Sequence, residues 1–287
     1  MDFLSQTLSN SKPLNAVSNL NSKDFKKKYL NKKQPVVLKN HASGWEAVKN
    51  WNIDFFTKLE SNKTVDLEVG NVIQNEAIFL RQSFKDYISK LHEGELNKSK
   101  SKTYLSMFNV FEHFPDLKRD TDFSIFSNYM KKSMTYAWIG PKNTITGFHA
   151  DSVNNMLAQI MGKKLVILSS TKSNKKMYPS KKFDLGAVLS EVDLNNYDEK
   201  KHPEFKKVEF YSATLEPGDV LYIPKGWWHY VRSLDTSISV NNFGYTKKET
   251  LLLKPVEVIK NSLHHRGYYK KNNCTCHKIV DGKWVSK

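Results

Sequence analysis

From Ser133 onward the sequence consists of short β-type segments separated by turn residues, and this pattern limits the fold more than any other feature. The segments are rich in β-branched and aromatic residues, and the pairs Gly140-Pro141 and Pro217-Gly218 are typical of the turns between strands. Eight strands are predicted: Met134–Ile139, Ile145–His149, Asn155–Met161, Lys164–Leu168, Val208–Ala213, Val220–Ile223, His229–Ser233 and Ser237–Phe243. Eight short strands are enough for a jelly roll of two Greek keys.

The changes of pattern along the 287 residues predict four regions. Residues 1–22 are rich in Ser and Asn and are expected to form a partly ordered lead-in. Residues 23–130 are expected to form an α/β region packed on the barrel, residues 131–245 the barrel itself, and residues 246–287 a C-terminal helix and a basic tail. The expected fold is therefore mainly β with flanking helices, a double-stranded β-helix of the jelly-roll type.

Outside the barrel, hydrophobic spacing and capping residues predict further elements. These are helices over residues 23–30, 45–59, 83–91 and 247–264, and strands over residues 35–38 and 64–69. A long polar insertion over residues 171–207 interrupts the barrel, and loops of this length are usually functional.

The composition excludes a chain that is disordered throughout, because 16 Phe, 13 Tyr and 6 Trp supply bulky groups for a core. Lys and Arg number 45 against 29 Asp and Glu, and the net charge of +16 would attract acidic proteins, nucleic acid or anionic small molecules. Lysines spread over any solvated surface explain the charge equally well, since a nucleic-acid site requires clustering on one face.

Two absences in the sequence bear on location. The start of the chain lacks a basic segment followed by an apolar run, and no apolar stretch approaches the length of a membrane span, so we expect neither secretion nor a membrane. Cys274 and Cys276 are separated by one residue and make a poor structural disulfide. A cytoplasmic or nuclear location is therefore expected.

A metal site is predicted from three residues of the barrel. His149 and Asp151 are two apart on an extended segment, so their side chains point to the same face. His229, at the start of a later strand, can close a facial triad of two imidazoles and one carboxylate, which suits non-haem Fe(II). The alternative is that His229 is a buried, hydrogen-bonded histidine and that Asp151 starts a turn.

Several motifs, taken in order and spacing, decide between these interpretations. They are the segments 146–151 (Thr-Gly-Phe-His-Ala-Asp), Asn155, 159–164, 218–224 and 227–232. This pattern resembles the JmjC-type, cupin-fold Fe(II)- and 2-oxoglutarate-dependent dioxygenases of the small hydroxylase type. The resemblance extends upstream through residues 35–38, Trp45, Trp51, Tyr104-Leu105 and 114–117, and it becomes weak before residue 23 and after about residue 250.

The resemblance implies a set of site residues. The iron ligands are His149, Asp151 and His229, and five further residues lie around the co-substrate 2-oxoglutarate: Lys164, Thr146, Tyr104, Asn155 and Asn241. Lys164, Thr146 and Tyr104 would bind its distal carboxylate, whereas the two asparagines would lie near its iron-chelating end. An inward ammonium needs a counter-charge, because a buried unpaired charge is costly. By strand alternation the neighbouring Lys163 points outward.

The reaction implied by the resemblance uses Fe(II), 2-oxoglutarate and O2, and it couples release of succinate and CO2 to the hydroxylation of a C–H bond. A protein side chain is the expected substrate. The alternatives are an RNA hydroxylase, since the tRNA wybutosine hydroxylase resembles the same core, a histone demethylase, and a non-catalytic cupin-fold binding module. The intact triad and Lys164 favour catalysis over the last of these.

Other features remain open. Asn242 and Gly244 stand where many members of the family have an aromatic pair. Cys274 and Cys276, with His264 and His265 upstream, could bind zinc, but their spacing is shorter than usual, so an exposed tail is the preferred interpretation. The basic aromatic run 264–271 has the composition of a single-stranded nucleic-acid contact, although a solvated tail explains it as well. A homodimer through the C-terminal helix is a further expectation.

Overall fold

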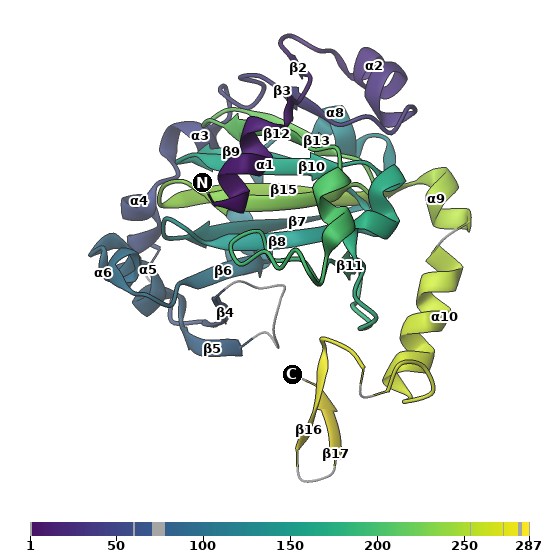
Figure 1. The fold of residues 1–287 in the computed structure, drawn as a ribbon. Coiled ribbons are helices and arrows are strands. Elements are labelled where there is room, and N and C mark those ends of the chain that lie inside the picture. Colours follow the sequence, from purple (N-terminus) through teal and green to yellow (C-terminus); the bar gives the residue numbers. More distant parts are fainter. Residues whose placement is uncertain are drawn as a thin grey trace.

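All eight predicted barrel strands are present, and they divide equally between two large sheets. The structure is a computed structural model that describes residues 2–59, 61–70, 78–252, 254–271, 273–280 and 283–286. One sheet contains β8 (Ile145–Asp151), β10 (Lys164–Ser169), β12 (Tyr211–Leu215) and β14 (Trp228–Ser233). The other contains β7 (Met130–Gly140), β9 (Asn154–Met161), β13 (Val220–Ile223) and β15 (Ser237–Thr246). These strands pair antiparallel within each sheet, which confirms the jelly roll (Figure 1).

Shorter strands extend both sheets. The first sheet has the order β1-β12-β10-β14-β8-β11, with β1 (Lys12–Pro13) and β11 (Ala187–Leu189) at its edges. The second has the order β2-β3-β13-β9-β15-β7-β6-β4-β5. Its added strands are β2 (Ala16–Val17), β3 (Val36–Leu38), β4 (Thr64–Val69), β5 (Ile78–Ser83) and β6 (Thr103–Phe108). A separate hairpin joins β16 (His277–Val280) to β17 (Lys283–Ser286).

Side chains alternate between the barrel interior and its outer faces, as the strand period requires. Leu157, Val166 and Leu221 pack inside, whereas Met156 on β9 faces a cluster made with the N-terminal helices. The turn between β9 and β10 depends on Gly162, which has φ +68°, and a Cβ there would lie 2.3 Å from a backbone oxygen. This tight turn starts β10 at Lys164.

Short helices of the N-terminal region cover the outer face of the nine-stranded sheet. They are α2 (Ser22–Phe25) with the π-helical turn Lys26–Leu30, α3 (Glu46–Asn50), α4 (Ile53–Thr57), α5 (Phe84–His92), α6 (Glu95–Lys98), α7 (Val110–His113) and α8 (Ser124–Ser127). The single helix predicted over residues 45–59 is wrong. It is two helices, because the chain becomes extended at Trp51 and the side chain of Asn52 caps α4 through the Phe55 amide.

The first 22 residues contain one helix and two short strands. Helix α1 (Phe3–Ser9) buries Leu4, and the Phe3 ring stacks on Tyr197 with ring centroids 3.8 Å apart. After the helix, Lys12 and Pro13 pair in parallel with β12. The apolar residues that looked scattered in the sequence therefore cover the outer face of the six-stranded sheet together with the insertion.

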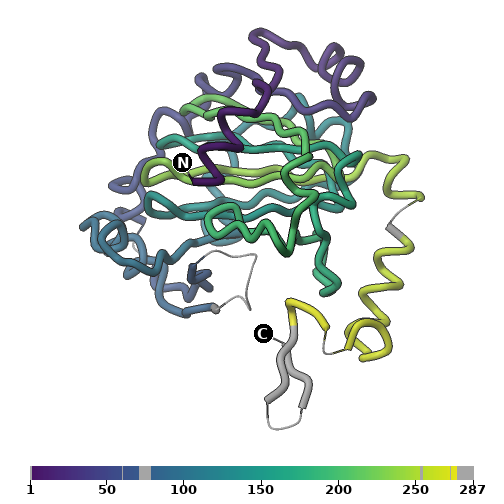
Figure 2. The backbone as a smooth tube through the Cα atoms, viewed as in Figure 1, coloured from purple at the N-terminus to yellow at the C-terminus, as the bar shows by residue number. Residues whose placement is uncertain are grey.

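The insertion and the C-terminal segment meet at one side of the barrel. The insertion contains two 3-10 helices, Thr171–Met177 and Pro203–Lys207, with β11 between them. The predicted C-terminal helix appears as α9 (Lys247–Leu252) and α10 (Lys254–His265), which extend away from the barrel (Figures 1 and 2). The segment beyond α10 contradicts the expected exposed tail, because Cys274 is buried and forms a β-bridge with Phe183 of the insertion.

The helices of the described residues also bear on the membrane question. None of them combines the length and the apolar character needed to cross a lipid bilayer.

Candidate active site

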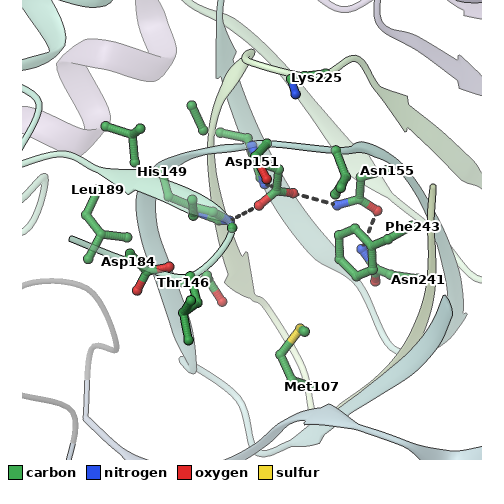
Figure 3. A pocket seen from close by; sticks show the side chains of 18 of the residues that line it. Met107, Thr146, His149, Asp151, Asn155, Asp184, Leu189, Lys225, Asn241 and Phe243 are labelled. Carbon is green, nitrogen blue, oxygen red and sulfur yellow. Dashed lines mark hydrogen bonds and ion pairs between the residues drawn. The ribbon is translucent and has the colours of Figure 1, made fainter. Parts of the chain in front are cut away.

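A cavity of about 1130 Å³ opens between the two sheets and contains the residues predicted from the sequence. All eight of them line it: Tyr104, Thr146, His149, Asp151, Asn155, Lys164, His229 and Asn241. They come from six strands, so no single segment of the chain forms the site. Figure 3 shows how several of them lie within it.

The three predicted metal ligands lie together at one wall. The register of β8 and β14 places His149 directly opposite His229. The two rings lie against each other, with centroids 3.9 Å apart, and Asp151 faces both, with its carboxylate oxygens 3.6 Å from Nε2 of His149 and 3.5 Å from Nε2 of His229. The three ligand atoms lie within 4.8 Å of one another, so one ion can contact all of them.

Both imidazoles are oriented for coordination in the same way. Nδ1 of His149 lies 2.9 Å from the carbonyl of Gly147, and Nδ1 of His229 lies 3.0 Å from the carbonyl of Trp227. A carbonyl only accepts, so each Nδ1 carries the proton and each Nε2 presents a lone pair toward Asp151. Metal-binding histidines are usually held in this manner.

Burial sets the charge state of the triad. It lowers the pKa of His229 well below the ordinary histidine value, and the neighbouring His149 lowers it further, so His229 is neutral. Burial also raises the pKa of Asp151, an effect that His149 and a hydrogen bond from Asn155 oppose. A desolvated carboxylate beside two imidazoles is stabilised by a bound cation, and the donor set is the one that Fe(II) takes in a facial triad.

A β-bulge brings Thr146 to the same face as the ligands. Residues three apart on a regular strand point to opposite faces, which would separate Thr146 from His149. The pairing shifts between His229 and Val231, so that two residues of β8 lie opposite Tyr230 alone. This extra residue turns Thr146 into the cavity, as Figure 3 shows, and such bulges commonly re-aim side chains near active sites.

The two asparagines form a relay behind the metal ligands. Asn241 on β15 donates from Nδ2 to Oδ1 of Asn155 at 2.8 Å, and Asn155 on β9 donates to Oδ2 of Asp151 at 3.3 Å (Figure 3). The relay orients the carboxylate between the two histidines. Strand alternation explains the arrangement, because both asparagines face the barrel interior.

Lys164 is a buried cation at the opposite end of the site. Its side chain is 1% exposed, and its Nζ donates to the hydroxyl of Tyr104 at 2.9 Å. No carboxylate of the described residues forms an ion pair with it, and burial lowers its pKa to about 7. An ammonium in this position favours an anionic ligand, so the residues fit a dicarboxylate such as 2-oxoglutarate. Lys163 is exposed and pairs with Glu216, as alternation predicted.

This burial predicts how stability depends on pH. The pKa of Lys164 is about 7 in the folded chain against an ordinary value of 10.5, so between these values the unfolded chain binds more protons at this group. The free energy of unfolding of the ligand-free protein should therefore rise with pH across this range. Denaturant titrations at several pH values would measure it, and Lys164→Met should lack this part of the increase. An identical pH dependence in both proteins would contradict the assignment.

Sequence analysis missed two further acidic residues of the cavity. Glu68 on β4 and Asp184 in the insertion both line it, and burial raises the pKa of Glu68 to about 7 and raises that of Asp184 as well. Neither belongs to a motif, and only the tertiary structure places them there. The insertion, predicted to be functional, lies at the site, because β11 pairs with β8 alongside His149 and Asp151.

Similarity to known proteins agrees with this geometry. A family model described as a cupin-like domain matches residues 22–249. The chain is 33% identical over 224 residues to a Xenopus tropicalis protein named lysine-specific demethylase 8, covering 76% of this chain and 49% of that protein. It is 35% identical over 231 residues to lysine-specific demethylase JMJ30 of Arabidopsis thaliana, covering 78% and 53%. The chain thus spans about half the length of these two relatives.

A shorter relative is matched almost completely. The chain is 29% identical over 243 residues to JmjC domain-containing protein A of Dictyostelium discoideum, and the match covers 80% of this chain and 94% of that protein.

Proposed function

Because this chain belongs to the family of cupin-like JmjC domains, as its motifs predicted, we propose that it is an Fe(II)- and 2-oxoglutarate-dependent oxygenase that hydroxylates a protein side chain. One observation carries the proposal: the triad of His149, Asp151 and His229 shares a cavity with a buried lysine that has no carboxylate partner among the described residues. A non-catalytic binding module requires neither feature.

The residues of the cavity have different roles in metal binding and in co-substrate binding. When bound, Fe(II) supplies the redox chemistry that couples O2 and 2-oxoglutarate to hydroxylation, with release of succinate and CO2. The imidazoles of His149 and His229 and the carboxylate of Asp151 would hold the ion, and three protein ligands would leave coordination positions for co-substrates. Lys164, with the hydroxyl of Tyr104, would bind the distal carboxylate of 2-oxoglutarate, and Thr146 of β8, which is separated from β10 by β14, lines the same cavity. The apolar barrel around them keeps bulk water away.

The charges around the cavity favour a protein substrate over RNA. Glu68 and Asp184 line it together with the lysines Lys225 and Lys260, and Lys225 pairs with Glu257 at 3.4 Å. Other lysines pair with acidic residues at many different places on the protein. These ion pairs include Lys12–Glu209, Lys28–Asp24, Lys49–Glu46 and Lys206–Glu199. This spread supports a generally basic surface rather than a nucleic-acid track at the entrance.

Demethylation is a second candidate, because two relatives are named lysine-specific demethylases. The two outcomes share the oxidation of a C–H bond and differ in which carbon is attacked. The acidic side chains of the cavity suit a cationic substrate side chain in either case.

One experiment tests the activity and sorts the candidates. Protein purified without oxygen and supplied with Fe(II) and 2-oxoglutarate should release succinate after oxygen is added, slowly even without substrate. Mass spectrometry of lysate proteins and of digested RNA would then be searched for a gain of one oxygen or the loss of a methyl group. Absence of both succinate and iron-dependent 2-oxoglutarate binding would overturn the oxygenase proposal.

The expected homodimer also remains a proposal. Apolar side chains of α9 and α10 are exposed, with Leu251 72% and Ile259 58% exposed, and apolar surface of this kind supports contact with a second copy. Sedimentation of the full chain should give a dimer, and Leu251→Glu combined with Ile259→Glu should shift it to a monomer, because a charge buried in such an interface is costly. A monomer before substitution would refute the contact.

A further inference from the structure

A second group of metal-ligand side chains lies outside the triad. His264 lies in the last turn of α10, and Cys274 and Cys276 follow on the segment that turns back toward the insertion (Figure 2). Their ligand atoms all lie within 4.8 Å of one another, and Nε2 of His264 is 3.2 Å from Sγ of Cys276. Neither cysteine takes part in a disulfide within the described residues.

His264 is held as the two histidines of the triad are held. Its Nδ1 lies 2.7 Å from the carbonyl of Tyr269, so Nδ1 carries the proton and Nε2 presents its lone pair toward the thiols. The ring is completely buried, with Phe183 packed on it at 4.3 Å between ring centroids. A solvated histidine would need neither arrangement.

The short spacing of the cysteines does not prevent both from facing the same ion. Residues 274–276 run alongside Phe183, with a β-bridge at Cys274 and a hydrogen bond from the Thr275 amide to the Phe183 carbonyl. In an extended segment residues two apart share a face. Thr275 points elsewhere, since its hydroxyl donates to Asp184 at 2.6 Å.

We infer that His264, Cys274 and Cys276 form a zinc site, separate from the iron triad, that fastens the C-terminal segment to the insertion. Thiolates with an imidazole prefer Zn(II) over the harder cations, and structural zinc is tetrahedral with Cys and His ligands. The cluster supplies three of the four ligands. The inference does not rest on the oxygenase activity.

The position of the cluster gives the zinc a structural role at the cavity. Thr275 and Cys276 line the same cavity as the triad, and so does Asp184. The insertion continues from there into β11, which pairs with β8 at His149 and Asp151. Zinc at the cluster would therefore hold together the cavity wall that is built from the insertion and the C-terminal segment.

Metal analysis of the full chain tests the inference. The protein is expressed with added zinc, purified with a reductant and without chelator, and its metal content is measured together with that of His149→Ala/His229→Ala, which lacks the iron site. One zinc per chain is expected in the iron-site variant and at least one in the unsubstituted chain, because the intact triad also binds Zn(II) when zinc is added. In the iron-site variant, Cys274→Ser/Cys276→Ser should lose it, whereas His265→Ala, an exposed neighbour outside the cluster, should keep it.

Two readouts do not depend on the cysteine variant folding. Cobalt added to the His149→Ala/His229→Ala protein should produce a thiolate-to-cobalt charge-transfer band. In the unsubstituted chain, alkylation of the two cysteines should be slow until a chelator is added. Absence of zinc and of the cobalt band in the iron-site variant, retention of zinc by that variant without the cysteines, or a disulfide between them in the purified protein would each overturn the site.

Discussion

Replacing Asp151 with alanine is expected to weaken Fe(II) binding by well over 100-fold and to abolish turnover of 2-oxoglutarate. Asp151 supplies the only negative charge of the triad, and its two oxygens face Nε2 of His149 and of His229. Loss of a group that merely supports a ligand costs about 10- to 100-fold in metal affinity, so loss of the ligand costs more. Anaerobic Fe(II) titration and succinate release would measure both effects.

Substitution of Asn155, which belongs to the asparagine relay, allows loss of a supporting hydrogen bond to be compared with loss of the ligand Asp151. Asn155→Ala removes the hydrogen bond to Asp151 but no ligand, so a loss of about 10- to 100-fold in Fe(II) affinity is expected. Asp184→Asn is the matched control, because it changes a carboxylate of the same cavity outside the triad and should leave substrate-free succinate release intact. Full turnover by Asp151→Ala would remove this residue from the ligand set.

Replacing Lys164 with methionine is expected to weaken the binding of 2-oxoglutarate and to stabilise the ligand-free protein. The Michaelis constant for 2-oxoglutarate should rise roughly 100- to 1,000-fold, since the distal carboxylate would be buried without its partner, a loss of about 3–4 kcal/mol. The ligand-free protein should become more stable at neutral pH, because a buried ammonium without a carboxylate partner is replaced by an apolar group of similar length. Succinate assays at increasing 2-oxoglutarate and denaturant unfolding would measure the two quantities.

Two variants make this result specific. Tyr104→Phe removes one hydrogen bond to the ammonium and should raise the same constant only about 2- to 10-fold. Lys163→Met removes the adjacent, outward-facing lysine and should leave it unchanged. An equal effect of the substitutions at positions 163 and 164 would mean that general positive charge, rather than the buried contact, attracts the co-substrate.

Much of this site could be predicted from local pattern. A period of two places His149 and Asp151 on one face and separates Lys164 from Lys163, and these relations hold in the structure. The same rule fails at Thr146, because the bulge in β8 depends on pairing with β14 and has no signal in the sequence of β8 alone. Helix boundaries failed for a related reason at Trp51, where packing and a side-chain cap interrupt a continuous helical pattern.

The sequence by itself determined the eight strands and the family, and it predicted the triad and Lys164 as site residues, since each depends on residue type and on spacing within one or two segments. Only the tertiary structure decided which side chains from distant segments come into contact. It joined β8 to β14 so that His229 meets His149, placed Glu68 and Asp184 in the cavity, and buried His264 with two cysteines that the sequence had suggested were exposed. These contacts join segments that are far apart in the chain. They are stabilised by burial and by electrostatic interactions between residues on different strands, so they cannot be predicted from the pattern of any one segment.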